Sequence, residues 1–167
     1  MASIELYLVR HGVAAERGDE FPDDSKRPLT PDGMTKLRRE ARGLLALGVK
    51  FDQILTSPLV RARQTAEIFA QAQDDKPPVA PLDALAPGGT PIQVVHALAE
   101  YSRRKVIALV GHEPNMGELA AKLIGARAAI PFKKGAVCRI DVDALPPGGT
   151  GAIRWFIPPR MLRALKK

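Results

Sequence analysis

Ile4–Gly12 reads IELYLVRHG and joins a short apolar run to a polar end. Its first six residues, Ile4–Val9, are rich in strand-forming side chains and predict a buried β-strand. A second run, Lys105–Val110, reads KVIALV and is nearly all apolar, as expected for a strand covered on both faces. A histidine stands two residues beyond the end of each run, His11 in the first case and His112 in the second. The pattern therefore predicts two buried strands that each deliver an imidazole.

Apolar runs of this kind alternate with amphipathic segments along the rest of the chain. The alternation predicts a three-layer α/β/α sandwich with a mostly parallel central sheet. With no internal repeat and no boundary in composition, we expect one domain over residues 1–167. The last two strands, joined by PPGGTG, are expected to form an antiparallel pair at a sheet edge. The expected strands are 4–9, 51–56, 79–82, 105–110, 136–142 and 152–157, and the expected helices are about 31–47, 59–72, 92–101, 115–124 and the basic tail 160–167.

The composition is that of an ordinary globular protein with a basic excess. The 167 residues include 46% hydrophobic side chains, and 25 Lys and Arg against 18 Asp and Glu give a net charge of +7. The single cysteine, Cys138, excludes an intrachain disulfide and a cysteine-rich zinc site. Glu5 lies where a signal peptide would be apolar, and no run approaches the length of a membrane span. We therefore expect a cytoplasmic protein with no membrane association.

Three polar segments should meet at one edge of the predicted sheet. Residues 51–56 run into SPLVRARQTA, which places Arg61 early in the following helix. If the three strands are parallel, their carboxyl ends share an edge, and ligands of such sheets bind there. His11, His112, Arg10 and Arg61 would then line one pocket. Guanidinium groups around two imidazoles favour an anionic ligand, and a phosphoryl group suits the planar arginine fork.

These motifs resemble those of the histidine phosphatase superfamily, also called phosphoglycerate mutase-like. LVRHG at 8–12, SPLVRARQTAEI at 57–68 and GHEP at 111–114 look like its three signatures, in the family's order. RPLT at 27–30, LAPGG at 85–89 and VGHEPNMGELA at 110–120 resemble the SixA-type phosphohistidine phosphatases within it. The resemblance covers about residues 4–159 and implies a phosphoglycerate mutase-like fold.

The resemblance assigns roles to the residues that match these motifs. His11 matches the nucleophile that accepts the phosphoryl group, and His112 matches the second histidine, which helps to hold that group. Arg10 and Arg61 match the arginines that bind phosphate, and Gly12 completes the first signature beside the substrate. Phosphate or sulfate is the ligand expected at this site. The scheme needs no metal and no cofactor, and the sequence offers no Cys/His cluster or paired carboxylates at metal-ligand spacing.

The match extends to Arg27, but two other features of the family pattern are less well matched. Arg27 belongs to the RPLT segment and would reach the phosphate from residues 13–30, a polar loop long enough to suggest a function. Family members often carry an acidic residue directly after RHG, but this chain has Val13. Asp83 is the nearest candidate for the proton donor that mutase-type relatives place after the third strand.

The implied function is a phosphatase that removes phosphate from a histidine of a protein partner, such as a phosphotransfer domain or a phosphocarrier. A phosphomonoesterase for a small metabolite would use the same phosphate site, and a non-enzymatic phosphate-binding module is the third alternative. The basic clusters at 103–105, 133–134 and 160–167 could suggest nucleic-acid binding. Aromatic residues make up only 5% of the chain and do not alternate with these charges, so we expect solvated faces and no nucleic-acid partner.

Overall fold

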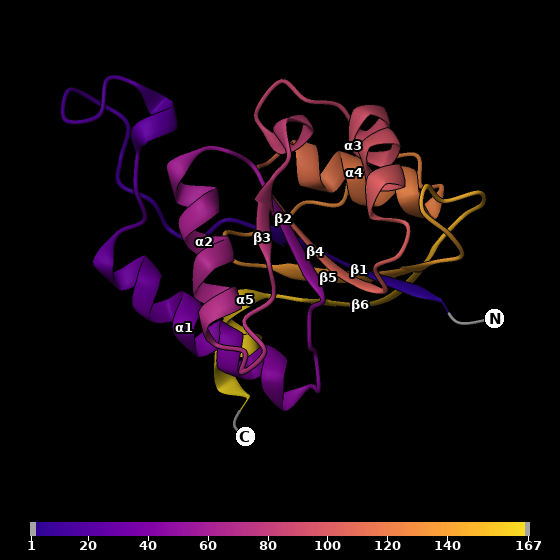
Figure 1. The fold of residues 1–167 in the computed structure, drawn as a ribbon. Coiled ribbons are helices and arrows are strands. Elements are labelled where there is room, and N and C mark those ends of the chain that lie inside the picture. Colours follow the sequence, from indigo (N-terminus) through magenta and orange to yellow (C-terminus); the bar gives the residue numbers. More distant parts are fainter. Residues whose placement is uncertain (1–2, 166–167) are drawn as a thin grey trace.

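A six-stranded sheet forms the centre of the computed structural model, which describes residues 3–165 (Figure 1). Its strands are β1 (Ile4–Arg10), β2 (Gln53–Thr56), β3 (Val79–Pro81), β4 (Val106–Gly111), β5 (Val137–Val142) and β6 (Ala152–Ile157). They lie in the order β3-β2-β4-β1-β5-β6. The pairs β3-β2, β2-β4 and β4-β1 are parallel, whereas β5 runs antiparallel to both β1 and β6. The predicted mostly parallel sheet, with its antiparallel pair at one edge, is confirmed.

Helices cover both faces of the sheet (Figure 1). Apolar side chains of α1, α2 and α5 pack on one face, and those of α3 and α4 pack on the other. Three short 3₁₀ turns complete the fold. The helices are α1 (Pro31–Ala46), α2 (Val60–Gln71), α3 (Pro91–Ala97), α4 (Asn115–Ile124) and α5 (Pro159–Ala164), and the 3₁₀ turns are η1 (Asp24–Lys26), η2 (Asp83–Leu85) and η3 (Leu98–Tyr101). This is the expected three-layer α/β/α sandwich.

The central strand β1 shows how the two apolar cores form. Successive side chains of a strand point to opposite faces. Leu6 and Leu8 accordingly join the core under α3 and α4, while Tyr7 and Val9 join the core under α1 and α2. All four are at most 1% exposed. A strand buried on both faces reads as a continuous apolar run, which is why the sequence pattern of β1 and β4 was decisive.

Element boundaries differ from the predicted ones where local hydrogen bonds intervene. The second strand begins at Gln53 rather than at residue 51, because the N–H of Phe51 donates to the side-chain oxygen of Gln73 at 2.9 Å. The third helix continues as a 3₁₀ turn after Ala97. The predicted helical tail forms over Pro159–Ala164, and its last two residues lie outside the described part of the chain.

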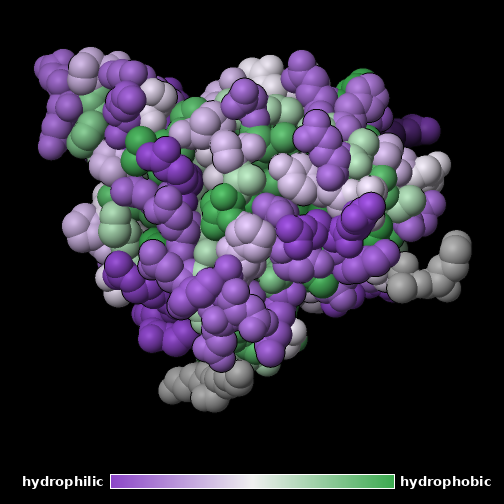
Figure 2. All heavy atoms as spheres, viewed as in Figure 1, coloured by the Kyte–Doolittle hydropathy of each residue, from purple (hydrophilic) through white to green (hydrophobic). Residues whose placement is uncertain are grey.

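The long polar loop at residues 13–30 has structure of its own. Isolated β-bridges join Ala14 to Leu29 and Gly18 to Phe21, and η1 forms a turn near its end. In Figure 1 the loop projects from the upper left, and Figure 2 shows a largely hydrophilic surface there. Within residues 3–165, no helix is long and apolar enough to cross a membrane.

The packing of α1 on α5 depends on a glycine. A Cβ at Gly43 would lie 2.1 Å from the carbonyl oxygen of Leu162, an atom of the α5 backbone. We expect Gly43→Ala to lower the melting temperature by several degrees, although alanine favours the helix by up to about 1 kcal/mol. Overpacking of this kind typically costs about 1–3 kcal/mol. Thermal unfolding of the variant, with the exposed Arg42→Ala as control, measures this, and an unchanged or higher melting temperature for Gly43→Ala would contradict it.

Candidate active site

The parallel pairing of β1 with β4 brings the two motif histidines together. Arg10 pairs with Gly111 at the ends of these strands, and the N–H of His11 donates to the Gly111 carbonyl at 3.0 Å. The rings of His11 and His112 follow directly, with centroids 5.1 Å apart. Both residues are buried, at 6% and 3% exposure. The structure thus brings the two predicted histidines to one sheet edge, as the strand pattern implied.

His11 is held in one tautomer. Its Nδ1 lies 2.7 Å from the carbonyl oxygen of Gly12. Because a carbonyl oxygen only accepts hydrogen bonds, Nδ1 carries the proton and Nε2 is unprotonated and carries a lone pair. Burial lowers the pKa of His11 to about 3 against the opposing effect of this hydrogen bond, and the charges of His112, Arg61 and Arg10 lower it further. At neutral pH the ring is therefore uncharged.

The backbone of Gly12 is fixed from two sides. Its N–H donates to Thr65 Oγ1 at 3.2 Å, and the Thr65 hydroxyl donates to the Arg61 carbonyl at 2.8 Å. A Cβ at Gly12 would lie 2.5 Å from Cδ1 of Leu37 on α1. Glycine at this position lets the chain pass under α1 with its carbonyl oxygen aimed at His11. Thr65 lies in the quoted RQTA segment, but sequence reasoning gave it no role.

His112 is oriented by a serine that sequence reasoning also missed. Its Nε2 lies 2.7 Å from Oγ of Ser57, which also accepts the N–H of Leu59 at 3.2 Å. Its Nδ1 is buried and has no hydrogen-bond partner among residues 3–165. Burial, followed by the charge of Arg61, lowers the pKa of His112 to about 4. A protonated His112 therefore requires the negative charge of a bound anion.

Arg61 connects the nucleophile candidate to the long loop. Its Nε donates to Nε2 of His11 at 3.3 Å, while Nη1 and Nη2 donate to the carbonyl and carboxylate oxygens of Asp24 at 2.8 and 3.0 Å. The side chain of Arg61 is 4% exposed. Two positions along α2, Arg63 is exposed and lies 4.0 Å from Glu67. The helix therefore directs one arginine into the site and the other to solvent.

Arg10 approaches the same histidines from the end of β1. Its Nη1 donates to the carbonyl of Phe132 at 2.7 Å, while its buried Nε has no hydrogen-bond partner in the described part of the chain. Burial lowers the pKa of Arg10 against the opposing charge of Glu113. The Arg10 charge in turn lowers the pKa of both His11 and His112. Unpaired N–H groups of this kind are rare in folded proteins and suit a ligand that accepts hydrogen bonds.

The two remaining candidates, one arginine and one carboxylate, lie in different surroundings. Arg27 is buried, and its Nε and Nη1 donate to Asp24 Oδ1 and to the Ala15 carbonyl at 2.9 and 2.6 Å. It thus reaches the site through Asp24. Asp83 begins η2 and is exposed, and among the described residues no hydrogen bond or ion pair joins it to either histidine.

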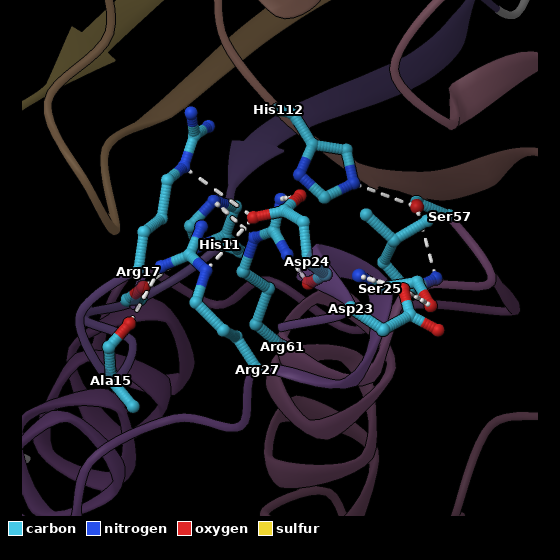
Figure 3. Close-up of polar contacts among 12 residues, drawn as sticks. His11, Ala15, Arg17, Asp23, Asp24, Ser25, Arg27, Ser57, Arg61 and His112 are labelled. Carbon is cyan, nitrogen blue, oxygen red and sulfur yellow. Dashed lines mark hydrogen bonds and ion pairs between the residues drawn. The ribbon is translucent and has the colours of Figure 1, made fainter. Parts of the chain in front are cut away.

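Asp24 is the site carboxylate that the sequence did not indicate. It accepts hydrogen bonds from Arg27 and Arg61 and lies 3.4 Å from Arg17 (Figure 3). Burial opposes its ionisation, but the hydrogen bonds from the two arginines outweigh burial and lower the pKa of Asp24. In the sequence it stands among Asp19, Glu20 and Asp23, and nothing in that run distinguishes it.

Together these groups form a cationic cradle with a neutral imidazole at its base. It offers a lone pair at His11 Nε2, an unpaired N–H donor at Arg10 Nε and an unpaired ring nitrogen at His112 Nδ1 within residues 3–165. Such a combination suits nucleophilic attack on a centre surrounded by anionic oxygens. Within residues 3–165, no group of three or more His, Cys, Asp or Glu residues could hold a metal ion.

Burial of neutral histidines makes stability depend on pH. Between pH 6.5 and about 4, the unfolded chain binds a proton at His112 that the folded chain does not, so acidification destabilises the fold. From pH 6.5 to 5 this amounts to roughly 2 kcal/mol. Burial raises the pKa of Glu40 to about 8, so its protonation stabilises the fold as the pH falls and opposes the effect of His112. The effect of His112 is therefore measured as the difference between the wild type and a variant that lacks this histidine.

In buffer without phosphate, we therefore expect the melting temperature of His112→Asn to fall less between pH 7.5 and pH 5 than that of the wild type. His96→Asn, which replaces an exposed histidine, should lose as much as the wild type. Thermal unfolding at the two pH values measures both differences. Equal losses in the wild type and in His112→Asn would mean that His112 is already protonated in the folded protein.

Comparison with known proteins gives consistent results. The family model described as Histidine phosphatase superfamily (branch 1) matches residues 6–86. The phosphohistidine phosphatase SixA of Escherichia coli is 28% identical over 166 residues, which cover 98% of this chain and 99% of that protein. An uncharacterised protein of Picosynechococcus sp. is 44% identical over 119 residues, or 70% of this chain and 71% of that protein.

A solved structure of the protein histidine phosphatase SixA, complexed with tungstate, superposes with a TM-score of 0.84 at 27% identity. The match covers 95% of this chain and 99% of that one. The chain thus shares its fold and nearly its full length with SixA, and the three motifs occur in the family's order. This protein belongs to the histidine phosphatase superfamily and is a SixA homologue with the superfamily's hydrolase fold.

Proposed function

We propose that this protein hydrolyses phosphohistidine on protein partners through a phosphorylated His11. The observation that carries the proposal is the hydrogen bond from Nδ1–H of His11 to the Gly12 carbonyl, because it leaves Nε2 unprotonated and directed toward Arg61. The full-length similarity to a phosphohistidine phosphatase supports the substrate class.

The reaction proceeds in two displacements. In the first, the Nε2 lone pair of His11 forms a bond to phosphorus, and the P–N bond of the substrate breaks with its electron pair passing to the departing ring nitrogen. In the second, water attacks phosphorus, the P–Nε2 bond returns its pair to His11, and inorganic phosphate leaves with the proton that water loses. Splitting the transfer in this way replaces one difficult step by two easier ones.

The donors around His11 stabilise the oxygens of the transferring group. Arg10 Nε and His112 Nδ1 are buried without partners, and Arg61 is already oriented on His11 Nε2. Phosphoryl transfer depends on positioning and on electrostatic stabilisation of these equatorial oxygens, which are the tasks that such donors perform. The negative charge of the phosphoryl group would also raise the pKa of His112 and favour its protonated form.

A protein histidine as substrate is supported by the short connection from β3 to α3, which begins at the same sheet edge as the histidines. This connection is only residues 82–90, so no long insertion there covers the histidines. The expected partners are phosphotransfer domains or phosphocarrier proteins that present a phosphorylated side chain. Inorganic phosphate or sulfate should occupy the same cradle.

The first test compares leaving groups. We expect kcat/KM at one pH to be highest for a phosphohistidine-bearing protein, intermediate for p-nitrophenyl phosphate and lowest for phosphoglycerate. An imidazole that is protonated near neutral pH leaves readily, whereas an alkoxide needs a strong general acid. Asp83→Asn should leave this order unchanged.

His11→Ala is the matched variant for this comparison. It should abolish turnover and also the acid-labile phosphate that a labelled donor leaves on the wild-type chain. If phosphoglycerate instead matches or exceeds phosphohistidine and Asp83→Asn removes only ester hydrolysis, the protein is a metabolite phosphomonoesterase and Asp83 is its acid.

The two arginines of α2 provide a further prediction. Arg61→Ala should reduce kcat by at least about 100-fold, in line with loss of one donor to a charged transition state. Arg63→Ala should change kcat little, because its side chain lies in solvent beside Glu67. Steady-state kinetics on the best substrate measures both, and similar losses at the two positions would remove the special role of Arg61.

A further inference from the structure

Asp24 occupies a position that the superfamily motifs do not explain. Its carboxylate is one guanidinium away from the nucleophile candidate, because Arg61 donates from Nε to His11 Nε2 and from Nη2 to Asp24 Oδ2. The carboxylate side chain is 43% exposed, so an incoming group can reach it from solvent. Figure 3 shows it among Arg17, Arg27 and Arg61, beside His11 and His112. It therefore stands at the mouth of the cradle.

This carboxylate is unsuited to act as a general acid. Hydrogen bonds from Arg27 and Arg61 favour its charged form, and Arg17 adds a third positive charge. An ionised carboxylate has no proton to give to a departing alkoxide, and its charge repels the negative charge that develops there. It can, however, accept a hydrogen bond from an N–H group of the leaving group.

Phosphohistidine is a substrate that can supply such an N–H group. The P–N bond occupies one ring nitrogen, and protonation of the other makes the ring an imidazolium with an N–H donor. A carboxylate near this N–H stabilises the cation and raises the pKa of the bound ring. When the P–N bond breaks, its electron pair neutralises the ring, which departs as neutral imidazole and keeps that proton. No proton has to move to Asp24.

We propose that Asp24 is a specificity-determining residue that accepts a hydrogen bond from the ring N–H of the departing histidine and so favours P–N over P–O cleavage. The proposal rests on the proposed function, since it concerns the leaving group of that reaction. It accounts for a carboxylate placed among phosphate-binding arginines, where a residue that only positioned these cations would compete with the phosphoryl group.

The test is Asp24→Asn assayed on two substrates. The amide keeps the size of the side chain and one acceptor oxygen but lacks the charge. We expect kcat/KM for a phosphohistidine-bearing protein to fall at least about 10-fold, and kcat/KM for p-nitrophenyl phosphate to rise, because a charge that opposes the phosphate dianion is gone. Asp23→Asn is the matched control, because among the described residues the side chain of Asp23 bonds only Ser25, and its replacement should change neither value.

The pH dependence of kcat on phosphohistidine separates this role from a structural one. The loss of activity at alkaline pH should move to lower pH in Asp24→Asn, because the bound imidazolium has lost its carboxylate. Arg17, Arg27, Arg61 and His112 face Asp24, and the Asp24 charge raises the pKa of His112. The pH profile on p-nitrophenyl phosphate, whose leaving group has no imidazolium, therefore serves as the reference for any change at His112. Asp24→Glu should restore the alkaline limb toward its wild-type position.

The outcomes are distinct. Parallel losses on both substrates, with no shift of the alkaline limb, would overturn the role of Asp24 and leave the proposed function standing. A wild-type enzyme that prefers p-nitrophenyl phosphate to phosphohistidine would overturn the proposed function, and the role of Asp24 with it.

Discussion

The parallel register of β1 and β4 is the constraint on which the site depends. Pairing of Arg10 with Gly111 places His11 and His112 at adjacent positions of one sheet edge, and pairing of Thr56 with Val110 brings Ser57 to the same edge. Since side chains alternate along a strand, a slip of one residue would turn every core side chain of β1 to the opposite face. The two apolar cores thus fix the register, and the register fixes the distance between the imidazoles.

Burial then determines the charge states of the site. Each histidine is almost fully covered and lies near arginines, so both are neutral in the folded chain. A nucleophilic imidazole must be neutral, but within residues 3–165 the buried Nε of Arg10 and Nδ1 of His112 are left without partners at a cost in stability. A bound phosphoryl dianion would offset this cost. The same unpaired groups therefore weaken the empty site and favour the occupied one.

Sequence reasoning was strongest where a side chain is fixed by regular structure. The continuous apolar runs predicted β1 and β4, and the motif that follows β2 placed Arg61 at the start of α2, where its side chain is buried. It was weakest for partners set by irregular backbone. Ser57 and Thr65 stood inside a recognised motif, but their contacts with His112 and Gly12 depend on how a turn and a helix end meet the sheet. Such contacts leave no periodic trace in a sequence.

Asp24 is another site residue whose position depends on irregular backbone and could not be predicted from the sequence. The loop that carries it is rich in acidic residues, and hydropathy treats them alike. What distinguishes Asp24 is a tertiary event, because the bridge between Ala14 and Leu29 closes the base of the loop and η1 turns this one carboxylate toward Arg61. The apolar side chain of Val13 and the exposure of Asp83 then have the same explanation. A site whose carboxylate is held ionised by arginines does not need a strong acid if its leaving group arrives already protonated.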